Sequence, residues 1–155
     1  MKLFTKTRTL MLVLSLLLAT IPATAVERPM ALKGAGVATL ITDEAGNPIA
    51  AIPTGSGTAT HLGQWTVSGK VNYTPDANGV IHSSGEGTLT AANGDKLNLT
   101  FDGILDPVAG VDQGFFYIVG GTGRFEGASG TLNFLVTVNF LTGGFDLTAV
   151  GKIDY

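Results

Sequence analysis

His61 and His82 are the only two histidines of the chain, and they are the first residues whose chemistry has to be considered. Because the chain has no cysteine, a zinc site would need both histidines together with carboxylates such as Glu86. On a strand, His82 and Glu86 would share one face, because alternate residues point to the same side. Surface or loop histidines are the commoner outcome, so we expect no bound metal.

Three carboxylates, Asp102, Asp106 and Asp112, bracket a stretch with Pro107 and Gly110 that reads as a loop. Such oxygen ligands could gather a calcium ion, but their spacing is not that of an EF-hand loop. We therefore interpret the three aspartates as solvated loop residues. The sequence predicts no cofactor.

Residues 117 to 134 read YIVGGTGRFEGASGTLNF, and this density of glycine raises the question of a phosphate-binding loop. A phosphate loop needs Gly-Lys-Ser/Thr before a helix, and a dinucleotide fingerprint also leads into a helix. Here no lysine is present, Glu126 follows the glycines, and the next segment has the pattern of a strand. The stretch therefore predicts a tight turn within a sheet.

The first 25 residues have the order of a secretory leader. Lys2, Lys6 and Arg8 precede an apolar run from Leu10 to Leu18, and small residues end at Ala25. That run is shorter than the roughly 20 residues of a membrane-spanning helix. We predict a signal peptide over residues 1–25, cleaved after Ala25, one domain over residues 26–155, and export to the periplasm or the extracellular space.

The predicted mature chain is acidic, and this excludes some partners. The leader holds three of the nine basic residues and no acidic ones, so six basic residues face twelve acidic ones, a formal net charge of −6. Nucleic-acid binding needs clustered Lys and Arg, so no nucleic-acid partner is expected. Without cysteine, an exported domain has no disulfide and depends on its core alone.

Beyond the leader, apolar residues alternate in twos, which is typical of half-buried strands. In DKLNLTFDGIL, for example, Leu97, Leu99, Phe101 and Leu105 share one face. The expected strands cover residues 34–41, 55–61, 64–73, 79–90, 95–105, 114–119, 124–134 or beyond, and 144–155. Turn signals such as Asn93-Gly94 separate them, and no segment reads as a helix. An all-β fold, a single antiparallel barrel of about eight strands, would remove exposed sheet edges.

GGTGRFEGASG, residues 120 to 130, resembles the G-G-[ST]-G-x-F-x-G-x-x-G pattern of plant allene oxide cyclases, dirigent proteins and many small exported bacterial proteins. The resemblance to that bacterial group extends to GTATHLGQWTVSG and GEGTLTAANGDKLNLTFDG, and so to most of residues 55 to 135. It implies an eight-stranded antiparallel barrel with a mainly apolar interior, often a homo-oligomer. The motif glycines would be structural: Gly120, Gly121 and Gly123 for the turn, Gly127 and Gly130 for bends.

Two features of the sequence are also found in other barrel families. Gly63-Gln64-Trp65 matches the G-x-W motif of lipocalins, but the expected lead-in is missing, so Trp65 is interpreted as closing the barrel. The alternating residues before Tyr155 resemble the last strand of outer-membrane barrels. One Trp and three Tyr are too few for two aromatic girdles, so we expect a chain that is not embedded in a membrane after cleavage.

Two classes of function remain open. The first is a non-catalytic barrel that binds a small apolar ligand or acts as a structural module. Its expected lining is Trp65, Leu97, Leu99, Phe101, Phe116, Phe134 and Phe140. The second is a cofactor-free cyclase or isomerase in which a polar group, with His82, Glu86 and Tyr117 as candidates, steers a reactive substrate. The quoted apolar strand faces carry almost no ionisable group, and this favours the first class.

Overall fold

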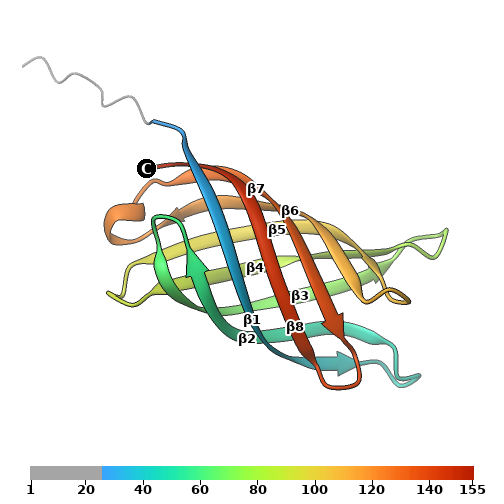
Figure 1. The fold of residues 1–155 in the computed structure, drawn as a ribbon. Helices are drawn as coiled ribbons and strands as arrows, with labels where there is room; N and C mark the ends of the chain where they lie inside the picture. Colours follow the sequence, from blue (N-terminus) through green and yellow to red (C-terminus); the bar gives the residue numbers. More distant parts are fainter. Residues whose placement is uncertain (1–25) are drawn as a thin grey trace, which may run out of the picture.

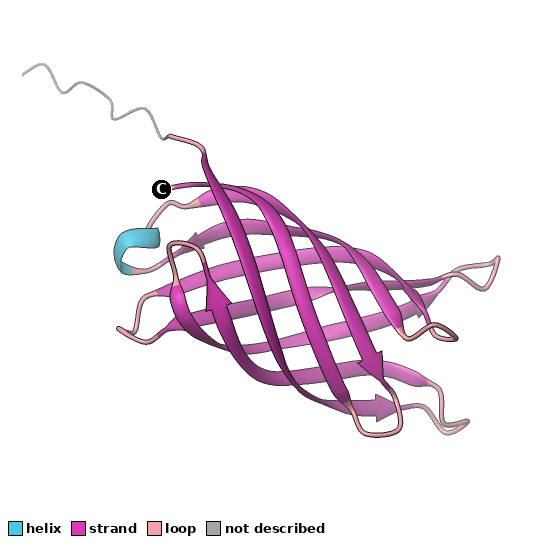
Figure 2. Cartoon of the chain, viewed as in Figure 1, coloured by secondary structure: helices cyan, strands magenta, loops and turns pink. Residues whose placement is uncertain are grey.

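The structure, a computed structural model, describes residues 26–155. The strands are β1 (Arg28–Thr42), β2 (Pro48–Ala59), β3 (Gly63–Pro75), β4 (Ile81–Ala91), β5 (Lys96–Asp106), β6 (Val111–Gly121), β7 (Ser129–Asn139) and β8 (Gly144–Asp154). A 3-10 turn, η1 (Gly123–Phe125), joins β6 to β7 (Figure 2). In residues 26–155 no helix has the length and hydropathy needed to cross a membrane. The predicted leader lies outside the described residues.

The eight strands form one closed sheet in chain order. Each strand pairs antiparallel with the next, and β1 also pairs with β8, from Arg28 opposite Ile153 to Val37 opposite Gly144. Figure 1 shows the strands wrapping around a common axis, with the start of β1, the end of β8 and the coil of η1 at one end. The predicted all-β, single antiparallel eight-stranded barrel is confirmed.

Some predicted strand boundaries were wrong. Strand β2 begins at Pro48 rather than at residue 55, although it contains Pro48 and Pro53. The ladder between β2 and β3 omits Ile52 and Pro53, and a proline is tolerated where no ladder hydrogen bond is required of it. Strand β7 begins at Ser129 rather than at residue 124, because the preceding residues form η1.

The end of the barrel that holds η1 and the two strand termini is filled with side chains, and we call it the closed end. Phe125 of η1 is 0% exposed and belongs to the same buried cluster as Trp65, Leu97 and Ile153. Its ring lies 5.2 Å from that of Tyr155, measured between centroids. An ion pair links this turn to the turn between β4 and β5: Nε of Arg124 lies 3.3 Å from Oδ2 of Asp95. The opposite end, called the open end, carries the turns at residues 42–48, 75–81, 106–111 and 139–144.

The glycine-rich stretch forms the turn that carries Phe125 into the closed end. Gly123 begins η1 with a φ of +61°, a left-handed conformation that glycine adopts without a Cβ clash. Gly120, Gly127 and Gly130 also have positive φ, whereas Gly121 does not. A Cβ at Gly121 would lie 2.1 Å from the carbonyl oxygen of Lys96, so this position needs glycine for space. The stretch therefore folds as a turn within the sheet.

We predict that Phe125→Ala lowers the free energy of unfolding by about 3–5 kcal/mol, because it removes a fully buried ring and leaves a cavity. The matched control is Phe115→Ala on β6, where the ring is 43% exposed and the loss should be below about 1 kcal/mol. Equilibrium urea unfolding of both variants measures the difference. Equal losses would show that η1 does not anchor the closed end.

Candidate functional site

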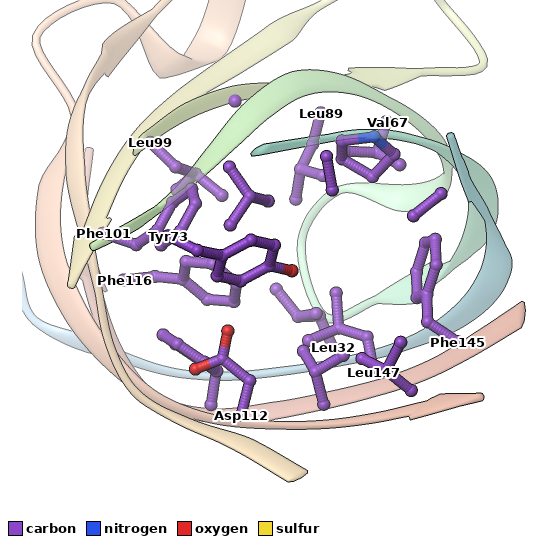
Figure 3. Close-up of a pocket in the computed structure, with 18 residues that line it drawn as sticks. Leu32, Val67, Tyr73, Leu89, Leu99, Phe101, Asp112, Phe116, Phe145 and Leu147 are labelled. Atoms are coloured by element: carbon purple, nitrogen blue, oxygen red, sulfur yellow. The ribbon is translucent and has the colours of Figure 1, made fainter. Parts of the chain in front are cut away.

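A cavity of about 100 Å³ lies inside the barrel, and all eight strands line it. Its wall consists of Leu32, Ala38, Ala51, Pro53, Val67, Val71, Tyr73, Gly87, Leu89, Leu99, Phe101, Asp112, Phe116, Phe134, Val136, Val138, Phe145 and Leu147. The close-up in Figure 3 shows these side chains converging from the surrounding strands on the interior. Since most of the wall is aliphatic or aromatic, the cavity suits an apolar molecule.

Three aromatic rings form one side of the cavity. Phe116 and Phe134 lie 4.5 Å apart between ring centroids, at an angle of 31°. Phe101 meets both rings edge-on, at 5.8 Å from Phe116 and 6.2 Å from Phe134. Edge-to-face and offset contacts are the favourable arrangements for aromatic rings. The cluster therefore offers a rigid apolar surface to a flat molecule.

The expected lining residues divide into two groups. Leu99, Phe101, Phe116 and Phe134 line the cavity. Trp65, Leu97 and Phe140 do not line it: Trp65 and Leu97 belong to the large buried cluster that also contains Leu99 and Phe134, and Phe140 packs against a second cluster made of Ala51, Tyr73 and Leu105. Members of both clusters contribute to the cavity wall.

Asp112 on β6 is a carboxyl group inside the barrel. It is 6% exposed and faces the interior between its register partners Leu105 on β5 and Val136 on β7. Its Oδ1 accepts a 2.7 Å hydrogen bond from the hydroxyl of Ser83, which is also buried. Burial raises the pKa of Asp112, and the hydrogen bond from Ser83 opposes this in part. The interpretation of Asp112 as a solvated loop residue was wrong.

The hydrogen bond between Ser83 and Asp112 spans from β4 to β6, across β5. Gly103 of β5 lies opposite Ser83, and a Cβ there would come within 2.8 Å of both the Ser83 hydroxyl and the Phe134 ring. The missing side chain therefore leaves the space that this hydrogen bond and the aromatic cluster occupy.

Tyr73 on β3 supplies a second polar group to the cavity. The residue is 8% exposed, and burial, aided by the charge of Asp112, raises its pKa to about 12. Figure 3 shows its hydroxyl and the carboxyl of Asp112 both projecting into the interior. No hydrogen bond joins the Tyr73 hydroxyl to another residue within 26–155. The hydroxyl thus stays protonated at physiological pH and can donate to a bound molecule.

The three candidate catalytic residues of the sequence lie on the outer face of the barrel. His82 and Glu86 are exposed on β4, and Nε2 of His82 is 3.6 Å from Oδ2 of Asp76. Tyr117 stacks on the exposed ring of Phe115, with centroids 6.4 Å apart, and its hydrogen bond with Asp102 raises its pKa. None of these three residues contributes to the cavity wall.

The structure does not assemble the metal sites that the sequence raised. His61 lies in the turn between β2 and β3 at the closed end, whereas His82 is the second residue of β4, at the open end. The aspartates also separate: Asp102 and Asp106 are exposed, and the Asp106 carboxylate accepts hydrogen bonds from the backbone amides of Val108 and Ala109. Within residues 26–155, no group of three or more His, Asp or Glu side chains is arranged to hold a metal ion.

One signal in the sequence could have found Asp112. Phe116 was expected to line the barrel, and Asp112 is four residues earlier on the same strand, hence on the same face. The signal was hidden because the other face of β6 is also apolar, with Phe115, Tyr117 and Val119.

We predict that Asp112 makes the protein less stable as pH rises. Its pKa is raised from 3.8 in the folded state, so in the window above 3.8 the folded state binds more protons than the unfolded state. Stability is therefore lost as pH increases through the folded-state pKa. In unfolding experiments across that window, Asp112→Asn should reduce the pH dependence of the free energy of unfolding. The control Asp106→Asn, at an exposed position, should leave this pH dependence unchanged. An unchanged slope in Asp112→Asn would contradict the assignment.

Comparisons with solved structures find a similar barrel in two pterocarpan synthase dirigent proteins. The pterocarpan synthase dirigent protein PsPTS1 aligns with a TM-score of 0.61 at 12% identity, over 84% of this chain and 96% of that chain. GePTS1, also a pterocarpan synthase dirigent protein, aligns with a TM-score of 0.56 at 15% identity, over 83% of this chain and 84% of that one. No protein-family model and no curated protein matches the sequence. The chain therefore shares the barrel fold of dirigent proteins.

Proposed function

We propose that the protein is an exported barrel that binds one small apolar molecule in its interior. The observation that carries the proposal is the cavity of about 100 Å³ lined by residues of all eight strands. Voids in a protein interior reduce stability, because the atoms that line them lack packing partners. Apolar cavities of similar size in proteins bind molecules such as benzene. A bound molecule would restore the lost contacts.

The two ends of the barrel differ in a way that supports entry from one side. Phe125 and Trp65 fill the closed end. Towards the open end, Leu40, Ile81 and Phe140 are only partly buried around the smaller cluster of Ala51, Tyr73 and Leu105. A ligand would thus enter between the turns of the open end. Export is part of the proposal because of the charged, apolar and small-residue order of residues 1–25.

The cavity can be tested with toluene as a probe of one ring. In a separate measurement, the protein is purified from its own host, and its mass under native conditions is compared with its mass under denaturing conditions. A difference would reveal a ligand that co-purifies with the protein. We expect toluene to shift the NMR signals of methyl groups in the cavity wall and to raise the melting temperature.

Val67→Phe should abolish toluene binding, because it fills the cavity from β3. Its control is Val119→Phe on the outer face of β6, where the side chain is 57% exposed and binding should persist. Equal binding by both variants, or no binding by the unmodified protein, would contradict an interior site.

A second function, a cofactor-free cyclase or isomerase, is favoured by one observation. Such an enzyme needs a buried ionisable group with a shifted pKa, and Asp112 is one. A protonated Asp112 could donate a proton to a substrate oxygen, and Tyr73 could orient that oxygen by a hydrogen bond. PsPTS1 and GePTS1 are named as synthases, which supports a barrel of this fold acting on a bound molecule. The outward residues His82, Glu86 and Tyr117 are poorly placed for this role.

Incubation of the protein with an apolar extract of its host separates the two functions. An enzyme would consume one compound and release an isomer of the same mass, detected by liquid chromatography and mass spectrometry. Asp112→Asn should then reduce the rate about 10²- to 10⁴-fold, the usual contribution of general acid–base catalysis. A binding barrel would leave every compound unchanged while it retains one of them.

A further inference from the structure

We propose that the cavity selects a neutral molecule with one hydrogen-bonding carbonyl oxygen on an apolar ring, and that it rejects organic anions. The inference rests on the proposed binding function and names its ligand class. It stands on the arrangement of three side chains, Tyr73, Ser83 and Asp112, against an otherwise apolar wall.

The Tyr73 hydroxyl is the first donor. Tyr73 is more than nine-tenths buried. Its hydroxyl forms no hydrogen bond with any other residue that the structure describes. The Tyr73 hydroxyl is not one of the fully buried polar atoms that lack a partner in the described chain, and Tyr73 lines the cavity, so a molecule in the cavity can reach the hydroxyl. A carbonyl oxygen in the cavity would accept this hydrogen bond.

Asp112 is the second donor when it is protonated. Its Oδ1 already accepts the hydrogen bond of Ser83, so the proton belongs on Oδ2. Oδ2 forms no hydrogen bond within the described chain. A carbonyl oxygen, with two lone pairs, can accept from both Tyr73 and Asp112.

The charges around the cavity exclude anions. Among the residues that line it, none is basic, and Asp112 is the one carboxyl. A carboxylate ligand would lose its hydration with no cation to pair with, and it would face Asp112. The rings of Phe101, Phe116 and Phe134 provide the complementary surface for the ring of the ligand.

Binding of the carbonyl should depend on pH through Asp112. The groups that face it are Tyr73 from β3, Ser83 from β4, Leu105 from β5 and Val136 from β7. Tyr73 is the other titratable group among them, and it remains protonated up to a pKa of about 12. Affinity for a ketone should therefore decline as pH rises through the titration of Asp112.

Three probes of similar size test the inference: acetophenone, α-methylstyrene and benzoate. α-Methylstyrene has the shape of acetophenone but carries a methylene group in place of the oxygen. Affinities are measured by NMR titration on the whole protein. Tyr73→Phe should weaken acetophenone binding about 2- to 10-fold, the range expected for one hydrogen bond, and leave α-methylstyrene unchanged. Tyr117→Phe, the same change on the outer face, should affect neither probe.

The pH series gives an independent result. Acetophenone should bind more tightly below the Asp112 titration than above it, and Asp112→Asn should remove this dependence while keeping a donor. Benzoate should not bind at the higher pH, where it is fully ionised; at the lower pH part of it is neutral benzoic acid, so only the higher pH tests the exclusion of anions. If Tyr73→Phe does not fold, the pH series by itself tests whether the cavity prefers a neutral carbonyl compound.

The outcomes separate the two proposals. Equal effects of Tyr73→Phe on acetophenone and α-methylstyrene, a pH-independent acetophenone affinity, or binding of ionised benzoate at the higher pH would overturn the selectivity and leave the binding function standing. If α-methylstyrene and acetophenone both fail to bind, the interior binding function itself fails, and the selectivity falls with it.

Discussion

The ladder between β1 and β8 is the interaction on which the rest of the structure depends. It joins Arg28 near the start of the described chain to Ile153 near its end, and it turns a row of hairpins into a closed sheet. Closure removes both sheet edges, so every strand pairs with a neighbour on each side. It also forces one face of every strand into a common interior. Residues from all eight strands therefore meet around one small volume.

That interior is packed unevenly, and the difference creates the site. At the closed end, η1 inserts Phe125 between the strands, where it meets Trp65 and Tyr155. The middle of the barrel has no such plug, and the rings of its wall pack against each other rather than across the axis. A side chain from a turn thus closes one end, while the strands alone enclose the cavity.

The barrel was predictable because alternation with a period of two is a local pattern. Leu97, Leu99, Phe101 and Leu105 share a face in any strand, and turn residues such as Gly94 mark where strands end. The start of β2 was missed because Pro48 and Pro53 are unfavourable in a strand, and only the partner strands show that Pro53 lies at a gap in the ladder. Asp112 was missed for a different reason. Its position depends on the face that β6 turns inward, and both faces of that strand are apolar.

The hydrogen bond between Ser83 and Asp112 bears on how β6 finds its place. A slip of one residue would exchange the two faces of that strand, bringing Phe115, Tyr117 and Val119 inward and carrying Phe116 and Ile118 to the surface. Hydrophobic burial discriminates weakly between these two arrangements, because both bury large apolar side chains. The slipped arrangement would leave the Ser83 hydroxyl buried without Asp112. A single polar contact in an apolar interior thereby distinguishes the native alignment of β6 from its nearest competitor.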